Sequence, residues 1–447
     1  MSRLQRLIQP RFSALLTSPD LRDLRRRGLE AWRRLGRYPH QVSIWLRADD
    51  PYAYLLLQAL PGLLAQFPVE LTLRTLRGTD ADTTPDPERL DALARIDAAR
   101  LARWHGLDFP DHADAPPPGL LILADSLLLA LERQAPEDAL ETATAVLRAV
   151  WWQDADSLRA LAAAHLPGTA TSADEDRLFS ANREAQRELG HYGSAMLHYA
   201  GEWYWGLDRI DHLSDRLQAL GLGTACQRWS THLDGHYLVG DPERLSQIRA
   251  GAGELDYHFS FRSPYSYLGL ARARALAEHY GLAFNLRPVL PMVMRGLPVP
   301  GIKRLYILLD AKREADRLGL PFGRVCDPVG AGVERCMAVC HHAGRQAPDF
   351  AEAAARAIWA DGADMTRDDT LTAVAASAGL KPARVREALD DTGWRRHAEA
   401  SRQAMAAQGH WGVPVLVLRR NGQVLCSAWG QDRLWVIEDK LNETATG

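Results

Sequence analysis

An internal repeat constrains the fold of this chain more than any other feature of its sequence. Residues 50–55 read Asp-Pro-Tyr-Ala-Tyr-Leu, and residues 263–268 read Ser-Pro-Tyr-Ser-Tyr-Leu. Two further pairs follow in the same order, namely Gly-His-Tyr-Gly at 190–193 with Gly-His-Trp-Gly at 409–412, and Trp-Gly-Leu-Asp-Arg at 205–209 with Trp-Gly-Gln-Asp-Arg at 429–433. Matches that keep one order while their offset drifts slowly indicate a duplication. The chain is therefore expected to hold two copies of one structural unit.

Each copy shows the same series of predicted elements. A β-type run leads into a helix that begins at a proline, and a second β-type run follows. These runs are 42–47 and 69–76 in the first copy, and 256–261 and 283–289 in the second. This order implies a parallel strand pair with a crossover helix. Ala-rich helical regions come next (120–164 and 333–409), and then two hairpin strands and a helix, in the second copy at 413–418, 423–427 and 434–441. The sequence predicts an α/β fold of two tandem thioredoxin-like domains, each with an inserted α-helical subdomain.

Composition places the boundaries around the two copies. Residues 1–40 hold ten Arg against three acidic residues and lack the apolar centre of a secretory signal, so we expect a basic helical arm. The first copy is assigned to residues 41–217, the connection to 218–253 and the second copy to 254–447. A chain of 447 residues is long enough for two or three domains.

Charge and cysteine usage argue against several classes of function. The formal net charge of −3 gives no general basic field, so nucleic acid is not expected as the main partner. No apolar run reaches membrane-spanning length. Five Cys in a chain of this length do not form a disulfide framework, and the absence of a Cys-x-x-Cys motif excludes dithiol–disulfide exchange. We expect a bacterial, cytoplasmic protein without a membrane span.

One segment has the composition of a metal site. Cys336 and Cys340 are followed by His341 and His342. The i, i+4 spacing of the two Cys also fits two small apolar residues on one helix face, and free Cys is commonly buried. Because no second ligand pair lies nearby in the sequence, we interpret the segment as a buried helix face and predict no metal.

Ser263 lies where a predicted strand meets a predicted helix. Ser is a preferred N-cap and Pro264 suits the first helical position, so capping alone explains the pair. A helix N-terminus also presents free N–H groups and partial positive charge, and a neutral hydroxyl there can donate a hydrogen bond to an anion. The pair predicts either a simple helix cap or a site that stabilises a bound thiolate.

Two later motifs have a structural and a functional interpretation as well. Val413 and Pro414 open a strand, either as a turn or with a cis bond that leaves the Val413 backbone groups free for an extended ligand. Gln431, Asp432 and Arg433 precede the last helix. They form either an ordinary capped helix start or a carboxylate aimed at the ammonium group of a ligand. Neither motif by itself distinguishes the structural from the functional interpretation.

Taken together, these motifs resemble a known family. Residues 255–441 are similar to the 2-hydroxychromene-2-carboxylate isomerases and the kappa-class glutathione transferases, which belong to the DsbA-like branch of the thioredoxin fold. Five motifs carry the resemblance: residues 259–269, Gly-Ile-Lys-Arg-Leu-Tyr at 301–306, Trp359, Gly-Val-Pro at 412–414, and Trp-Gly-Gln-Asp-Arg-Leu at 429–434. Their order along the chain is specific for the family and not for a substrate.

The resemblance implies glutathione as the cofactor. Ser263 would hydrogen-bond the glutathione sulfur and hold it as a thiolate, with Pro264 and Tyr265 on the substrate side. Val413, before a cis Pro414, would pair with the cysteinyl backbone of glutathione. In an isomerase of this kind the thiolate adds to the substrate, permits rotation about a bond and leaves again, so glutathione is not consumed.

The resemblance also assigns residues to the two ends of glutathione. Asp432, flanked by Gln431 and Arg433, would hold the γ-glutamyl end. Lys303 would face the glycyl end or a substrate carboxylate. It is one of only four Lys among 53 cationic side chains.

The first copy departs from the family pattern at the positions that matter for chemistry. Asp50 replaces the Ser, Ala195 replaces the cis-proline, and Leu90 stands opposite Lys303. A cis bond before a residue other than Pro costs roughly 2.5–4 kcal/mol, so we expect a trans bond before Ala195. We interpret this copy as degenerate, packing against the second copy or shaping its substrate entrance.

Two functions remain open at this point. The leading interpretation is a glutathione-dependent isomerase or transferase that acts on a small electrophilic, aromatic substrate. The alternative is a non-catalytic thioredoxin-like protein that binds a peptide or another protein, which the degenerate copy and the basic arm favour. A homodimer is compatible with both, and the fold alone does not decide between them.

Overall fold

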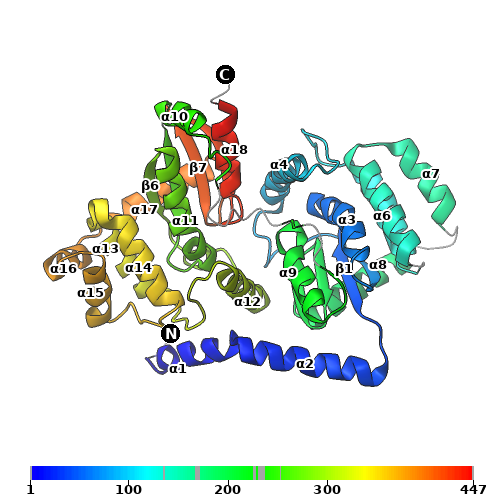
Figure 1. The fold of residues 1–447 in the computed structure, drawn as a ribbon, viewed down its shortest axis with the longest axis horizontal. Coiled ribbons are helices and arrows are strands. Elements are labelled where there is room, and N and C mark those ends of the chain that lie inside the picture. The colour runs from blue at the N-terminus through cyan, green and yellow to red at the C-terminus, as the bar shows by residue number, and fades with distance from the viewer. Residues whose placement is uncertain are drawn as a thin grey trace. The chain divides into compact units, whose positions relative to one another are not determined.

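The computed structural model describes residues 3–133, 136–166, 172–224, 228–229, 237–251 and 253–444. The chain divides into two compact units, each with its own four-stranded sheet (Figure 1). The N-terminal unit comprises Leu24–Ser230, and the C-terminal unit comprises Thr231–Gly447 together with Met1–Asp23. Within these described ranges, no helix is both long enough and apolar enough to cross a bilayer.

The N-terminal unit has the strand order β2-β1-β3-β4. Strand β1 (Gln41–Leu46) is parallel to β2 (Glu70–Thr75) and antiparallel to β3 (Met196–Tyr199), and β3 is antiparallel to β4 (Glu202–Trp205). Helix α2 (Pro19–Gly36) leads into the unit. Its other helices are α3 (Pro51–Leu64), α4 (Pro87–His105), α5 (Pro118–Leu131), α6 (Pro136–Trp151), α7 (Ala155–His165), α8 (Ser172–Glu188) and α9 (Gly206–Ala219).

The C-terminal unit has the corresponding strand order, β6-β5-β7-β8. Strand β5 (Glu254–Phe259) is parallel to β6 (Ala283–Pro288) and antiparallel to β7 (Val415–Arg420), and β7 is antiparallel to β8 (Gln423–Trp429). Its helices are α1 (Arg3–Leu16), α10 (Pro242–Ala250), α11 (Pro264–Tyr280), α12 (Gly301–Arg317), α13 (Ala331–His342), α14 (Ala347–Trp359), α15 (Asp368–Ser377), α16 (Pro382–Asp390), α17 (Trp394–Ala406) and α18 (Leu434–Thr444). Two short 3-10 helices are η1 (Met292–Arg295) and η2 (Gly344–Gln346).

The strand-helix-strand order and the closing hairpin that the sequence predicts are present in both units, and the fold is α/β. Strands β5 and β7 are shifted by two residues from the predicted runs. The chain turns after Phe259, where the Ser263 N–H bonds the Ser260 carbonyl at 3.0 Å. Strand β7 begins only after Pro414, which has no N–H to donate.

The helical insertions are longer than the sequence predicts. In the C-terminal unit the helical region after β6 begins with α12 at Gly301, well before residue 333, and in the N-terminal unit it continues to Glu188, beyond residue 164. The segment before α12 is rich in Pro and Gly, and these residues interrupt the periodicity on which the prediction rested. The boundaries proposed at 41, 218 and 254 stay predictions.

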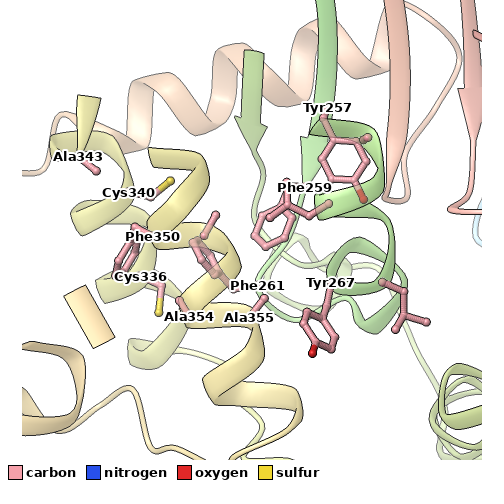
Figure 2. Packing of buried hydrophobic residues seen from close by; sticks show 14 of the residues in the cluster. Tyr257, Phe259, Phe261, Tyr267, Cys336, Cys340, Ala343, Phe350, Ala354 and Ala355 are labelled. Atoms are coloured by element: carbon pink, nitrogen blue, oxygen red, sulfur yellow. The ribbon is translucent and has the colours of Figure 1, made fainter. Parts of the chain in front are cut away.

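The core of the C-terminal unit lies between the sheet and the helices that follow it (Figure 2). Phe261 packs edge-on against Phe259 of β5, with ring centroids 5.0 Å apart, and against Phe350 of α14 at 6.2 Å. Helix α11 approaches β5 closely, because a Cβ added at Gly269 would lie 2.6 Å from the Tyr257 hydroxyl oxygen. This packing fixes the start of α11 at the carboxyl end of β5.

Candidate functional site

Ser263 is the N-cap of α11. Its backbone is extended (φ −107°, ψ 114°), and its hydroxyl oxygen accepts a hydrogen bond from the Ser266 N–H at 3.1 Å. Pro264 occupies the first helical turn, as the sequence predicts for a capped start. The same hydroxyl donates to the Val413 carbonyl at 3.3 Å. Ser263 is partly exposed, so a helix N-terminus with a hydroxyl beside it faces outward from the end of the central strand pair.

The loop before β7 supplies the second part of the site. The Val413–Pro414 peptide bond is cis, and it is the one cis bond among the residues that the structure describes, so the bond before Ala195 is trans. Within the same described part of the chain, no acceptor lies within hydrogen-bond reach of the Val413 N–H. Gly412 must be glycine, since a Cβ there would lie 2.4 Å from the Trp429 ring. Val413 thus presents a bonded carbonyl and an open N–H beside Ser263.

The turn at residues 430–433 is tied to this loop. The Gly430 N–H donates to the Pro414 carbonyl at 2.9 Å. Gln431 and Arg433 are buried, with exposed fractions of 1% and 4%, while Asp432 is partly exposed. The Gln431 amide donates to the Asp432 carboxylate at 2.5 Å. Of these three predicted residues, Asp432 is therefore the one whose side chain is accessible to a ligand.

Two residues that the sequence analysis did not single out hold this turn in place. Arg272 of α11 donates to the side-chain and backbone oxygens of Gln431, at 2.7 and 3.2 Å. Glu314 of α12 is fully buried and accepts from the Gln431 amide at 3.1 Å. Burial lowers the pKa of Arg272, while the carboxylates of Asp432 and Glu314 oppose that shift. A buried cation is thus balanced by two carboxylates, one of which is Asp432.

Tyr265 and Lys303 lie on either side of the contact between α11 and α12. The Tyr265 hydroxyl donates to the Asp310 carboxylate at 2.7 Å, and Arg313 donates to the same carboxylate at 3.1 Å. Lys303 is partly exposed in the first turn of α12, seven residues before Asp310 and therefore on the same helix face. Tyr265 thus uses its hydroxyl to join two helices. Lys303 thus lies at the start of α12, and no hydrogen bond joins it to Ser263.

The loop that precedes Ser263 is held by a second set of contacts. Arg262 forms two hydrogen bonds to the Asp327 carboxylate, at 2.7 and 2.8 Å. The Trp359 indole N–H donates to the Phe261 carbonyl at 3.2 Å. Trp359 belongs to the motif set found in the sequence, but the partner of Arg262 lies 65 residues away in an irregular segment. No spacing in the sequence could have paired them.

Three thiols in the described part of the chain are buried and have raised pKa values, which makes them poor nucleophiles. Cys336 and Cys340 are buried in the helical core of the C-terminal unit (Figure 2). Burial raises the pKa of Cys340 to about 12 and that of Cys326 to about 11, and it raises the pKa of Cys336 further. In the described part of the chain, no group of three His, Cys, Asp or Glu side chains is placed to hold a metal. Residues 336–340 of α13 are buried, whereas His341 and His342 are partly exposed, and Cys226 lies outside the described residues.

The matching position of the N-terminal unit carries an acidic cluster. Asp50 is the N-cap of α3 and accepts from the Tyr52 N–H at 3.0 Å. Burial raises the pKa of Asp50, and the nearby Arg47 guanidinium lowers it. Burial also raises the pKa of Asp91 to about 6. Arg47 bonds Asp49 at 2.6 Å and lies 3.8 Å from the Asp91 carboxylate, so one guanidinium pairs with two carboxylates and also attracts Asp50.

The model of the DSBA-like thioredoxin domain matches residues 254–442. The C-terminal half of the chain is a DsbA-like thioredoxin domain. All predicted site residues from Ser263 to Arg433 lie inside the matched segment, and the N-terminal unit lies outside it.

Two 2-hydroxychromene-2-carboxylate isomerases are similar to this chain. One from Pseudomonas putida is 24% identical over 197 residues, which cover 42% of this chain and 93% of the relative. One from Sphingobium xenophagum is 26% identical over 199 residues, which cover 42% of this chain and 97% of the relative. A solved structure of a 2-hydroxychromene-2-carboxylate isomerase matches with 22% identity and a TM-score of 0.36, over 42% of this chain and 95% of its own. The solved structure of the cytosolic disulfide reductase DsbM from Pseudomonas aeruginosa with GSH matches with 20% identity and a TM-score of 0.33. The match covers 43% of this chain and 97% of that chain.

Proposed function

We propose that the C-terminal unit binds glutathione and uses it in an isomerase or transferase reaction on a small electrophilic, aromatic substrate. The observation that carries the proposal is the position of Ser263. Its hydroxyl caps α11 and reaches the Val413 carbonyl, while the Val413 N–H is open among the described residues. The similarity to two 2-hydroxychromene-2-carboxylate isomerases supports the isomerase branch of the proposal.

The residues of the site fit the chemistry of glutathione. A cysteinyl peptide unit needs one acceptor and one donor from an extended backbone, and Val413 offers its carbonyl and its open N–H. Asp432 is partly exposed and would hold the γ-glutamyl ammonium group. Lys303, partly exposed at the start of α12, would hold the glycyl carboxylate or a substrate carboxylate. Gln431 and Arg433 would position Asp432 from their buried places.

Bound glutathione supplies a thiol nucleophile. Ser263 can turn its hydroxyl proton from the Val413 carbonyl toward the sulfur, because a hydroxyl hydrogen rotates to suit its acceptor. Such a charge-assisted hydrogen bond is worth roughly 1.5–3 kcal/mol, which lowers the pKa of the sulfur by about one to two units. The N-terminus of α11 adds about 0.3–1 kcal/mol in favour of the negative charge. Pro264 and Tyr265 would line the side on which the substrate approaches.

Among the described residues, no exposed thiol offers a nucleophile. The sequence has no Cys-x-x-Cys motif, and position 263 carries a hydroxyl where a dithiol oxidoreductase needs a thiol. The described Cys side chains are buried, with raised pKa values at Cys326, Cys336 and Cys340. An enzyme built this way would use a borrowed thiolate.

The open N–H of Val413 also suits an extended peptide, and this observation keeps a second candidate function. In that alternative the C-terminal unit is a non-catalytic peptide- or protein-binding domain. The two candidates differ in their smallest ligand. Glutathione alone stabilises the protein in the first case and has no effect in the second.

A thermal-shift titration of the full chain with glutathione tests the proposal. A ligand that binds only the folded state at 100 times its dissociation constant stabilises that state by about 2.7 kcal/mol. We expect a concentration-dependent rise in the unfolding temperature for the native chain and a much smaller rise for Ser263→Ala.

The control is Asp241→Ala, which removes the N-cap of α10 in the same unit without touching the site. It should lower the unfolding temperature in the absence of ligand, as Ser263→Ala should, yet keep the full response to glutathione. A native chain that does not respond to glutathione at any concentration rejects the proposed function.

A further inference from the structure

Helix α1 docks on the C-terminal unit through its polar residues. Ser13 accepts a hydrogen bond from the Val325 N–H at 2.8 Å, and Gln9 accepts from the Asp327 N–H at 3.0 Å. Arg6 contacts Thr366 and lies 3.7 Å from the Asp364 carboxylate. The contact is close, because a Cβ added at Gly362 would lie 2.7 Å from Pro10. The side of α1 that faces the protein is therefore its hydrogen-bonding side.

The opposite side of α1 is apolar and faces solvent. Its large apolar side chains are 53–66% exposed and recur at helical spacing: Leu4, Leu7, Ile8, Phe12 and Leu15. A surface helix of a globular protein ordinarily has the reverse orientation, with the apolar stripe against the core. An ordinary packing role therefore does not explain this helix.

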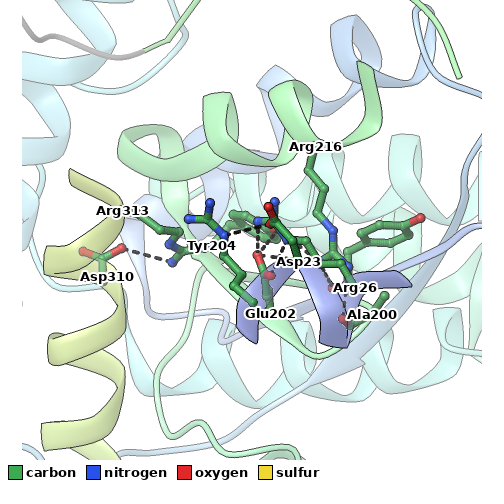
Figure 3. Close-up of polar contacts among 10 residues, drawn as sticks. Asp23, Arg26, Ala200, Glu202, Tyr204, Arg216, Asp310 and Arg313 are labelled. Carbon is green, nitrogen blue, oxygen red and sulfur yellow. Dashed lines mark hydrogen bonds and ion pairs between the residues drawn. The ribbon is translucent and has the colours of Figure 1, made fainter. Parts of the chain in front are cut away.

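Helix α2 repeats the pattern, and from Leu24 onward it belongs to the N-terminal unit. Arg26 of α2 donates two hydrogen bonds to the Glu202 carboxylate, at 2.7 and 2.8 Å (Figure 3). Next to this pair, Arg216 of α9 donates to the carbonyl of Ala200 at 3.2 Å. Arg216 also lies 3.6 Å from the Glu202 carboxylate. Along another side of α2, apolar side chains at i, i+3, i+11 and i+14 are exposed: Leu21, Leu24, Trp32 and Leu35.

These two helices hold most of the exposed apolar side chains of the molecule. Among the described residues, sixteen large apolar side chains are exposed, and ten of them lie between residues 4 and 38. Exposed apolar residues that are scattered singly need no explanation, but a concentration of this kind marks an interaction surface.

The charge of the same segment indicates what covers it. Residues 1–40 hold ten Arg against three acidic residues, a formal charge of +7, so residues 41–447 carry −10 of the total of −3. Helix α1 has no acidic residue, and Arg11 is exposed on it. Arg25, Arg27 and Arg37 are exposed along and after α2. The apolar stripes are thus flanked by cations on a chain that is otherwise acidic.

We propose that the apolar side of α1, and separately that of α2, binds the surface of an anionic lipid bilayer. Helices with Leu, Phe and Trp on one side and Arg beside them lie in the bilayer interface, with the apolar side buried among the headgroups and acyl chains. Each Arg near an anionic surface strengthens this binding. The helices lie on the bilayer and do not cross it, in keeping with the lack of a spanning helix among the described residues.

A second copy of the chain is a less suitable occupant of this surface. A two-fold dimer places the same surface of each copy together. Such a contact would bring exposed Arg side chains such as Arg11, Arg25 and Arg27 of both copies close together, and this repulsion opposes the apolar gain. An anionic bilayer offers apolar burial and charge compensation together.

Vesicle co-sedimentation of the full chain tests the proposal. Vesicles of phosphatidylcholine with phosphatidylglycerol should bind the protein, and vesicles of phosphatidylcholine alone should bind it at least about tenfold more weakly. Added salt should weaken the binding to anionic vesicles. The double variant Leu7→Gln/Phe12→Gln should bind at least about tenfold more weakly. Arg11→Gln should reduce binding to anionic vesicles by about fivefold.

Two measurements keep the outcome decisive. Ile122→Gln, which changes an apolar side chain of α5 with 64% exposure, is the matched control and should bind vesicles like the native chain. Circular dichroism of Leu7→Gln/Phe12→Gln should match the native spectrum, since both side chains face solvent. Absence of binding to anionic vesicles, or equal binding by the double variant, overturns the proposal. So does a native dimer that the double variant makes monomeric while neither form binds vesicles.

Discussion

The two units differ less in their scaffold than in the groups that would meet a ligand. In the C-terminal unit Tyr265 donates to Asp310 at 2.7 Å. In the N-terminal unit Tyr52 donates to Asp97 at 2.8 Å. In each pair the tyrosine and the aspartate are 45 residues apart in the sequence. Each pair connects the helix after the first strand to the helix after the second strand.

The loop before the closing hairpin is matched in the same way. The Gly430 N–H bonds the Pro414 carbonyl at 2.9 Å, and the Gly206 N–H bonds the Ala195 carbonyl at 2.8 Å. The strand order is also the same in both sheets. These contacts lie at matching places in the two units, and the duplication that the sequence repeat indicates stays a prediction.

The helix caps differ in their chemistry. Ser263 has a neutral hydroxyl that can donate a hydrogen bond, whereas the Asp50 carboxylate can only accept one when it is ionised. At about 4 Å a carboxylate would repel a thiolate by about 1 kcal/mol in water, or 4 kcal/mol at an effective dielectric of 20. The comparison shows that one strand order and one cap position can carry two different capping groups, a neutral hydroxyl and a carboxylate.

The largest effect concerns a carboxyl group that one unit has and the other lacks. Glu438 of α18 is fully buried and accepts from the Tyr280 hydroxyl at 2.9 Å, while its Oε2 has no hydrogen-bond partner. Ser214 occupies the matching position of α9. Burial raises the pKa of Glu438 to about 7. Because the folded state favours the protonated acid, stability should fall as the pH rises from about 4.5 to about 7, by at most about 3 kcal/mol.

Glu438→Gln should remove this pH dependence from the C-terminal unit. Hydrogen exchange of α18 and α11, measured at pH 5 and pH 8, gives the local stability of the native chain and of the variant. Ser214→Ala should leave the pH dependence of the N-terminal unit unchanged. Equal pH dependence in the native chain and Glu438→Gln would falsify the assignment of this carboxyl group.

The second-largest difference between the units is expected from alanine substitutions of the glycines in the two matched loops. A Cβ at Gly412 would lie 2.4 Å from the Trp429 ring, whereas a Cβ at Gly193 would lie 3.1 Å from the His191 ring. Overpacking of this kind costs about 1–3 kcal/mol. Gly412→Ala should therefore destabilise the C-terminal unit by that amount and weaken glutathione binding. Gly193→Ala should destabilise the N-terminal unit less and leave glutathione binding unchanged. Urea unfolding and calorimetric titration with glutathione measure both effects.

The matched tyrosines should show a smaller difference. Asp310 is 1% exposed, and Asp97 is partly exposed and can use water. Tyr265→Phe should cost about 1 kcal/mol more than Tyr52→Phe, because a buried acceptor that loses a donor is not rehydrated. Denaturant unfolding of both variants compares the two costs, and a larger loss from Tyr52→Phe would contradict the matched roles.

The smallest effect is expected at the two matched turns. Asp432→Asn should weaken glutathione binding about two- to fivefold, the size of a partly exposed ion pair. Asp208→Asn, at the matching position of the N-terminal unit, should leave the affinity unchanged. Calorimetric titration of both variants decides this, and an equal loss in the two would mean that Asp432 does not contact glutathione.

The sequence predicted the parts of the site that depend on neighbouring residues. The cap at Ser263 with Pro264 follows from local helix preferences, and the family resemblance pointed to Val413 and Asp432. The contacts of Arg272 and Glu314 with the turn at 430–433 were not predictable. They join segments that are distant in sequence, and a charged residue on a helix has no local sign that it is buried. The outward apolar face of α1 was missed for the same reason, since an amphipathic pattern does not say which side meets the protein.

The central claim is that Ser263 holds a thiolate that Asp50 cannot hold, and the ultraviolet thiolate band of the full chain saturated with glutathione tests it most directly. Ser263→Asp keeps a capping side chain on α11, so the fold should persist. We predict that this variant loses the band, and that Ser263→Ala loses it only partly, because the N-terminus of α11 still favours an anion. An undiminished band in folded Ser263→Asp would contradict the account and leave Ser263 as a helix cap.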